Sequence, residues 1–183
     1  MRFYRRAIVE DGLILAVFAV AVAVIQPRGN FPILDDWDFA IATWRFAQTG
    51  HFHFTNFTAV SLRAMVLWGA AWTRLFGESF NVLRASTLTL SFGTLCVFNR
   101  TLKLAAVPTS LRIVSTLALL FHPLYLWLSC TYMTDVPYLF ASSIAIYAFV
   151  VALRDGRLGW LLAGCLAVMT AWFIRQNGVM LLL

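Results

Sequence analysis

Charged residues are scarce in this chain, and their scarcity indicates its class. Only 12% of the 183 residues are charged, whereas 61% are hydrophobic. Soluble domains carry about 25% charged residues and about half apolar ones. The composition therefore argues against an ordinary soluble domain and predicts an integral membrane protein, whose length is better counted in spans of about 20 residues.

Cysteine is also sparse, and no internal repeat, low-complexity tract or soluble linker occurs. Cys96, Cys130 and Cys165 are odd in number and lie inside or beside apolar runs. We expect small buried hydrophobic side chains there, not a disulfide framework or a metal site. His51 and His53 stand one residue apart in "HFHF", and we interpret them as interfacial residues rather than metal ligands.

Basic residues outnumber acidic ones by fourteen to eight, giving a net charge of +6. They flank apolar segments singly or in short groups, which is typical of membrane topology signals and contacts with lipid headgroups. The expected partner of this charge is therefore the lipid bilayer, and we expect no nucleic acid.

Apolar runs predict one polytopic transmembrane domain over residues 1–183, of the all-α class. We expect spans at about 7–26, 82–99, 111–130, 137–153 and 158–174, with a further one starting near 179. Since four apolar blocks follow the first, that first run is predicted to be a retained span and not a cleaved signal peptide. The run at 179 has no flank beyond it, so we expect the chain to be truncated at its C-terminus.

Loop charges predict the orientation of these spans. The N-terminus and the turns at residues 100–112 and 154–157 are basic, whereas residues 27–58 and 131–136 are acidic or nearly neutral. The positive-inside rule then places the N-terminus and the basic turns in the cytoplasm. This parity needs one span between the long first loop and the turn at 100–112.

The stretch 59–77 is therefore predicted to be an interfacial helix and not a span. Arg63 and Arg74 bracket only residues 64–73, too few to cross a hydrocarbon core of about 30 Å. Trp68 and Trp72 would lie at the level of the lipid headgroups. Residues 27 to about 80 then form one long extracytoplasmic loop.

A second interfacial helix is predicted within that loop, over about 36–48. In "DDWDFAIATWRFAQTG" Trp37, Ile41 and Trp44 recur at helical spacing, and Gly50 ends the pattern. Asp35 is expected to cap this helix. We expect Asp38 and Arg45 elsewhere on its surface, away from the tryptophan stripe.

Two acidic sites face the same side of the membrane on this topology, the pair Asp35–Asp36 and the single Asp135. Ionisable residues at or in a membrane are functional candidates by default. Helix capping accounts for one acid of the pair and, ahead of Pro137, for Asp135. Two adjacent acids exceed what capping requires, so the residues alone leave both function and capping open.

The chain resembles the GT-C membrane glycosyltransferases that use polyprenyl-phosphate sugars, such as protein O-mannosyltransferases and lipid A aminoarabinose transferases. The resemblance begins at "DDWDFAIATWRFAQTG", with Asp35, Asp36, Phe39 and Gly50 at the positions of the first-loop signature. It continues in order through "FGESFNVLRAS", "TYMTDVPYLFASSIAIYAF" and "MTAWFIRQNGVMLLL". It covers nearly the whole chain, and the order of the motifs carries more weight than any one of them.

The resemblance implies a helical bundle with short juxtamembrane helices in a long first extracytoplasmic loop. It implies inverting transfer of a sugar from a polyprenyl-phosphate donor to an extracytoplasmic glycan, lipid or protein acceptor, in the cell (inner) membrane. Asp35 would be the general base, and Asp36 and Asp135 would position the acceptor, or a divalent metal cation where a member uses one. Arg175 would bind the departing lipid phosphate, with Arg63 as a second candidate.

The chain departs from the family after the first loop helix. Many relatives carry an acidic-basic-proline motif there, whereas this chain has "FTNFTAVSLRAMVLW". Without that Glu and Pro, neither metal binding at this point nor the aminoarabinose branch is implied. Since family active sites draw on later spans, we expect the 183 residues alone to be inactive. The alternatives are a polytopic transporter or channel subunit and a non-catalytic membrane assembly protein.

Overall fold

Helices form every regular element of the described chain. The computed structural model describes residues 2–55 and 61–182, with side chains from residue 9 to residue 181 within those ranges. Because no strand occurs in these ranges, the predicted all-α class is confirmed. The elements are α1 Arg2–Ile25, α2 Asp36–Thr49, α3 Arg63–Phe76, α4 Phe80–Leu104, α5 Thr109–Leu120, α6 Pro123–Ser129, α7 Asp135–Asp155, α8 Leu158–Ile174 and the 3₁₀ helix η1 Gln176–Leu182.

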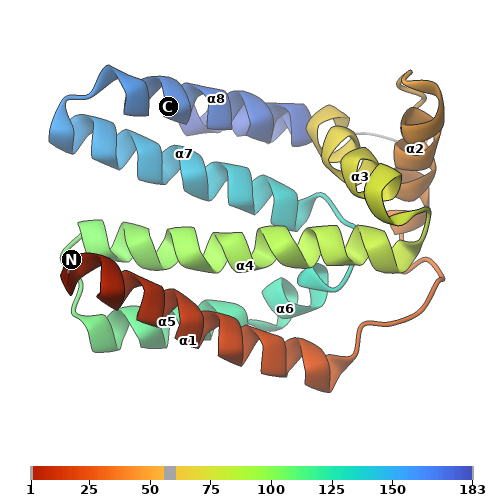
Figure 1. Ribbon diagram of the computed structural model, residues 1–183. Coiled ribbons are helices and arrows are strands. Elements are labelled where there is room, and N and C mark those ends of the chain that lie inside the picture. The colour runs from red at the N-terminus through yellow and green to blue at the C-terminus, as the bar shows by residue number, and fades with distance from the viewer. Residues whose placement is uncertain (1, 56–60, 183) are drawn as a thin grey trace.

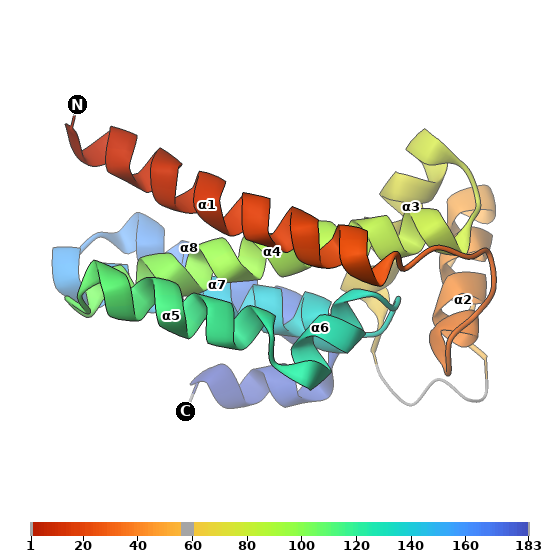
Figure 2. The ribbon, with the colours of Figure 1, turned by 90° about the horizontal axis from the view of Figure 1, so that it is seen from below.

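The long helices alternate in direction along the molecule (Figures 1 and 2). α1, α4, the α5–α6 pair, α7 and α8 extend along its length, while α2 and α3 gather at one end. This α2–α3 end also holds the start of α4, the start of α7 and the end of α8. The connections α4–α5 and α7–α8, which carry the basic turns, lie at the opposite end.

The interior of the bundle is unusually polar along α4. Ser86, Ser91 and Thr94 are buried there. The Ser91 hydroxyl donates to the Tyr125 hydroxyl at 3.0 Å and lies 2.8 Å from the Ser129 hydroxyl. Such interhelical hydrogen bonds between small polar side chains are typical of helices that pack inside a lipid bilayer.

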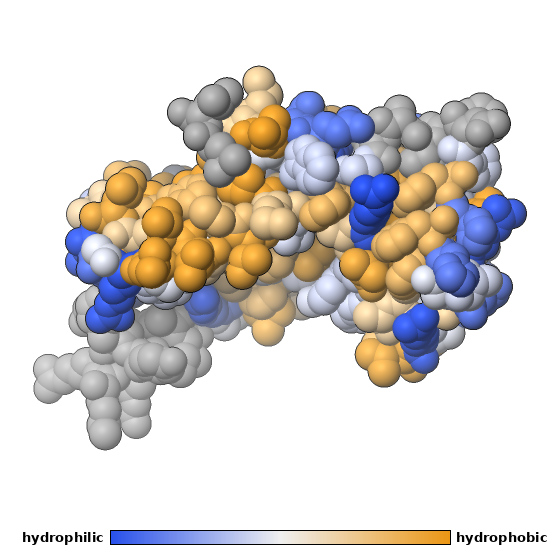
Figure 3. Space-filling view, turned by 90° about the horizontal axis from the view of Figure 1, so that it is seen from above, coloured by the Kyte–Doolittle hydropathy of each residue, from blue (hydrophilic) through white to orange (hydrophobic). Residues whose placement is uncertain are grey.

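The outer surface, by contrast, is widely apolar. Figure 3 shows a broad hydrophobic stretch over one long side of the molecule, with hydrophilic side chains at both ends. Many large exposed apolar residues lie on α7 and α8, among them Leu153, Leu158, Leu162, Leu166 and Met169. On a protein in water, an apolar surface of this extent would mark a site of contact with another protein or with a membrane.

Few of the predicted spans pass a test of length and composition. Among the described residues α7 alone is long and apolar enough to cross a membrane as one helix, and α5 with α6 passes as a bent pair. α8 is apolar but has 17 residues, roughly 25 Å at 1.5 Å per residue. The membrane placement of the bundle therefore stays a prediction.

The segment predicted to span at about 111–130 is helical, but it is broken in the middle. α5 ends at Leu120, α6 begins at Pro123, and the two helices are bent by 63°. Proline has no N–H to donate and disfavours the helical conformation of the residue before it. Accordingly His122 is extended, with φ −63° and ψ 124°, and its side chain is exposed at the break.

The buried face of α2 is not the predicted one. Asp38 is 3% exposed, whereas Trp37, expected on the apolar stripe, is 38% exposed. The buried stripe instead runs through Asp36, Phe39 and Thr43. Helical spacing identified the helix, but the packing of α2 on α3 and α4 determines which face is covered.

The main hydrophobic core sits at the α2–α3 end. Phe39, Met65, Val66, Leu83 and Tyr132 form its buried part, and they come from α2, α3, α4 and the segment before α7. α3 covers the region of the predicted interfacial helix, of which residues 59–60 lie outside the described part. The core thus fixes the first-loop helices directly beside the start of α7.

Candidate functional site

The loop that precedes α2 is fastened to the start of α4. Arg84 is 1% exposed and donates to the carbonyl oxygens of Gly29, at 2.7 Å, and Phe31, at 2.5 Å. The side-chain oxygen of Asn30 accepts from the backbone N–H of Phe80 at 3.0 Å. These bonds satisfy backbone groups of the loop and set the position at which α2 begins.

Asp36 is the most buried of the predicted site residues, with no exposed surface. One carboxylate oxygen accepts from the backbone N–H of Ile33 at 2.6 Å, and the other lies 4.0 Å from Arg84. Burial raises the pKa of this carboxyl above 3.8. The Ile33 N–H, the Arg84 charge and the Tyr132 backbone oppose the rise, and the Asp35 charge adds to it.

Asp35 has a different environment from its neighbour. It occupies the N-cap position of α2, but its side chain is exposed and makes no capping hydrogen bond. The predicted capping role is therefore wrong. Its carboxylate is accessible at the surface of the α2–α3 end, where a polar molecule can reach it.

Asp135 and Arg175 form an ion pair across two helices, with 3.0 Å between oxygen and nitrogen. Asp135 is the first residue of α7, and Thr134 takes the N-cap position that the sequence assigned to Asp135. The Nε of Arg175, just after α8, donates to the Thr134 hydroxyl at 2.7 Å. Both charged side chains are about a third exposed, at 30% and 33%, so this pair is open to solvent or a ligand.

Arg63 directly follows residues that contact the end of α8, near the Asp135–Arg175 pair. It is exposed at the first position of α3. The preceding residue, Leu62, donates its backbone N–H to the carbonyl oxygen of Ile174 at 3.4 Å, and the Ser61 hydroxyl donates to the carbonyl oxygen of Trp172 at 2.6 Å. The start of α3 is thereby held beside the end of α8.

Tyr132 links the two acidic sites through the segment between α6 and α7. Its hydroxyl donates to the carbonyl oxygen of Met65 at 3.1 Å and lies 3.0 Å from the Thr43 hydroxyl. Burial raises the pKa of the Tyr132 phenol, so it remains a neutral hydrogen-bonding group. Because its backbone also influences Asp36, the segment that leads to Asp135 packs against the start of α2.

An apolar cavity of about 770 Å³ opens between α3, α4, α7 and α8. Its lining includes Ala64, Ile174 and Pro137. The first two directly adjoin Arg63 and Arg175 in the chain, and Pro137 lies two residues after Asp135. The cavity itself is lined by no charged side chain, but its lining includes residues within two positions of Arg63, Asp135 and Arg175.

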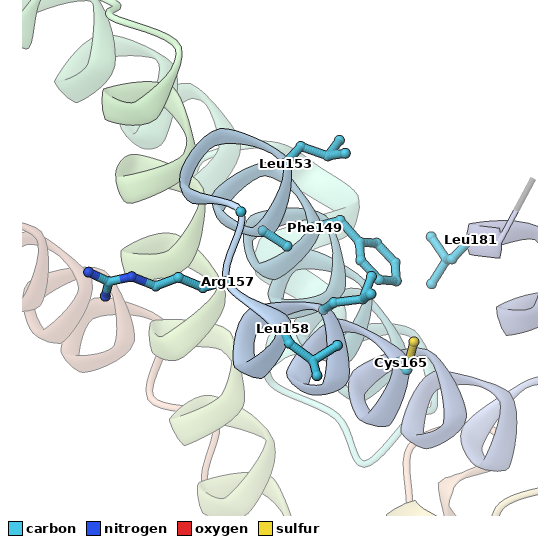
Figure 4. Close-up of a pocket in the computed structure, with 9 residues that line it drawn as sticks. Phe149, Leu153, Arg157, Leu158, Cys165 and Leu181 are labelled. Carbon is cyan, nitrogen blue, oxygen red and sulfur yellow. The ribbon is translucent and has the colours of Figure 1, made fainter.

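A second cavity, of about 660 Å³, lies toward the opposite end between α7 and α8 (Figure 4). Phe149, Leu158 and Leu181 are among its lining residues, and the Arg157 side chain extends away from it. Its lining is almost entirely apolar, so this cavity holds no cluster of polar side chains that could act on a substrate.

No metal-ligand set is formed within the described residues. No group of three or more His, Cys, Asp or Glu side chains in these ranges could hold a metal ion. Asp36 and Asp135 each face an arginine, a poor environment for a divalent cation, and His51 and His53 are exposed. The site is therefore described by its acids and arginines alone.

Sequence reasoning missed Arg84 and Tyr132. The available signal for Arg84 was its place, within "FGESFNVLRAS", near the start of a helix whose other charged residues, Arg100 and Lys103, lie at the far end. Tyr132 carried no comparable signal. Comparison of this chain with protein-family models, curated proteins and solved structures gives no match.

Proposed function

We propose that this chain is part of a membrane glycosyltransferase that moves a sugar from a polyprenyl-phosphate donor to an acceptor outside the cytoplasm. The observation that carries the proposal is that three features lie at the α2–α3 end. These are the exposed Asp35, the open Asp135–Arg175 pair and the apolar cavity whose lining includes Ala64 and Ile174, the chain neighbours of Arg63 and Arg175.

Placement in a bilayer is part of the proposal. The bundle buries hydroxyl groups and exposes large apolar side chains over its long sides. In water this arrangement would leave a large apolar surface exposed, whereas in lipid that surface is solvated and the interior hydrogen bonds join the helices. The α2–α3 end would then face away from the cytoplasm, because the basic turns lie at the other end.

Within the site, Asp35 acts as the general base. The acceptor oxygen bonds to the anomeric carbon while the bond from that carbon to the donor phosphate oxygen breaks. The acceptor's proton passes to the Asp35 carboxylate. Asp35 suits this role better than Asp36, because its carboxylate is exposed and has no capping bond, whereas Asp36 is buried and occupied by Ile33 and Arg84.

Arg175 binds the departing polyprenyl phosphate. A guanidinium is permanently charged and can donate two parallel hydrogen bonds to a phosphate. The ion pair with Asp135 and the bond to Thr134 hold the Arg175 side chain in position while leaving part of it open. Asp135 is thus a positioning residue for Arg175, and Arg63 adds positive charge nearby.

A transporter is less well supported. Transport sites usually lie near the bilayer midplane on interrupted helices. Among the described side chains, buried charge occurs near the two ends, at Asp36, Asp38 and Arg84 and at Arg112, and the middle of the bundle holds hydroxyl groups such as Ser91 and Tyr125. The break at Pro123 carries no charged side chain.

Replacing the base tests the proposal. In membranes from cells that express the complete open reading frame, supplied with radiolabelled undecaprenyl-phosphate mannose, we expect Asp35→Asn to reduce label transfer by about 10²–10⁴-fold. Asp155→Asn, an exposed acid at the opposite end, is the matched control and should transfer as the wild type does. Equal transfer by both variants at equal expression would exclude Asp35 as the base.

A further inference from the structure

A groove separate from the 770 Å³ cavity lies between α1 and α4. It has a volume of about 490 Å³, in the range of roughly 300–1,000 Å³ that small-molecule sites occupy. Along most of its length it is apolar, lined on α1 by Phe18, Ala19 and Ala23 and on α4 by Ala85 and Leu88. Ala19 and Ala23 are exposed, so the groove opens to the outside of the bundle.

The end of this groove nearest α2 and α3 is basic. Arg28, Asn81 and Arg84 line it, and none of its lining residues is acidic. Asp36, 4.0 Å from Arg84, balances one of the two charges from outside the lining, which leaves Arg28 unmatched. The groove therefore presents net positive charge and an amide at one end of an apolar channel.

Two buried polar atoms at this end have no hydrogen-bond partner among the described residues, the Nε of Arg84 and one carboxylate oxygen of Asp36. Arg84 is 1% exposed, and its terminal nitrogens donate to Gly29 and Phe31, but its Nε has no hydrogen-bond partner. Leaving a buried donor of a charged group unpaired costs free energy that a bound acceptor would recover. An anionic oxygen in the groove would be such an acceptor.

We propose that the α1–α4 groove binds one anionic phospholipid. Its phosphate meets Arg28 and Asn81 and reaches the Nε of Arg84, which is buried in the structure, once that side chain turns toward the groove. An acyl chain lies along Ala19, Ala23 and Leu88. Charge selects an anionic over a zwitterionic headgroup, because no acidic side chain lines the groove to hold a choline or an ammonium group. The site is independent of sugar transfer, although it also rests on the bilayer placement of the bundle.

Native mass spectrometry of the purified protein in detergent tests the headgroup. With added palmitoyl-oleoyl phosphatidylglycerol or the matching phosphatidylcholine, we expect the wild type to retain phosphatidylglycerol preferentially. Arg28→Gln should lower its affinity for phosphatidylglycerol by about tenfold, as loss of one charge-assisted hydrogen bond predicts. Arg45→Gln is the control, because Arg45 is exposed on α2 and does not line the groove.

Filling the channel tests the acyl chain. Ala19→Phe should lower retention of phosphatidylglycerol, whereas Ala118→Phe, at an exposed alanine of α5 outside the groove, should not. Equal retention of the two lipids, equal effects of the two arginine variants, or equal effects of the two alanine variants would overturn the proposal. So would complete displacement of the lipid by millimolar glycerol phosphate, which would indicate a site for a phosphate alone.

Discussion

Adjacent aspartates in this chain have opposite environments. Asp35 is exposed at the N-cap position, whereas Asp36 is fully buried between the loop before α2 and Arg84. Burial of a carboxyl beside a single arginine at 4.0 Å leaves desolvation as the largest influence on its pKa, which rises. Identical residue types one position apart can therefore take different roles, one facing solvent and the other holding the loop to α4.

The raised pKa of Asp36 predicts how stability depends on pH. In the unfolded chain this carboxyl titrates near 3.8, and in the folded protein it titrates higher. The folded state therefore binds more protons between the two values. The stability that this proton contributes is fully present below pH 3.8 and is lost as the pH rises through the folded-state pKa.

Asp36→Asn should remove this dependence, because an amide does not titrate. We expect the melting temperature of the wild type to fall more steeply than that of the variant from about pH 4 upward. The measurement is thermal unfolding in detergent across that range. Asp155→Asn, at the opposite end, should keep the wild-type slope, and a slope unchanged in Asp36→Asn would contradict the assignment.

At the scale of elements, α3 packs against the segment before α7 through a glycine. A methyl group added at Gly69 would collide with the Tyr132 hydroxyl and approach Thr43 at 2.9 Å. Without that side chain, the Tyr132 hydroxyl reaches the carbonyl oxygen of Met65. The close approach of α2, α3 and residues 130–135 thus depends on the absence of a side chain at Gly69.

Gly69→Ala should therefore destabilise the α2–α3 end. Overpacking of a well-filled core costs about 1–3 kcal/mol, which thermal unfolding in detergent would detect as a lower melting temperature. Gly159→Ala is the matched control on α8, where a methyl group meets nothing within 4 Å and alanine favours the helix. Similar melting temperatures for the two variants would show that the approach of Tyr132 to α3 is not tight.

At the scale of the whole molecule, hydroxyl groups are buried among the apolar side chains of the interior, and many large apolar side chains are also exposed. Hydroxyl groups and a few ion pairs lie inside, including Glu10–Arg112 at 2.7 Å. Large apolar side chains lie outside. The alternation of long helices brings 27–55 and 130–135 to one end, and the basic turns to the other. This arrangement supports the proposed bilayer placement.

Labelling from one side of the membrane tests that placement. In a background with all three cysteines replaced by alanine, we expect a membrane-impermeant maleimide to modify His53→Cys in intact spheroplasts. Arg157→Cys should react only after the membrane is opened. Both positions are exposed, in the loop after α2 and just before α8. Reaction of both from the same side would refute the proposed topology and with it the extracytoplasmic site.

The helical class and the positions of most helices can be predicted from the amino-acid sequence alone. Its apolar content predicts a helical membrane protein, and the predicted loop helix at about 36–48 corresponds to α2, Asp36–Thr49, with Gly50 as a left-handed cap at φ 73°. These features are local, because helical periodicity, helix capping and the ending of a helix at glycine or proline depend on neighbours within about one turn.

Which side chains are buried and which charges pair can be seen only in the folded arrangement of the helices. The pairs Arg84–Asp36 and Arg175–Asp135 join residues from different elements, and Tyr132 reaches Thr43 and Met65 across the core. Helical spacing says which residues share a face but not which face another helix will cover, and packing leaves Trp37 38% exposed while it buries Asp38. Burial and pairing follow from how helices pack, and that information lies outside any single segment.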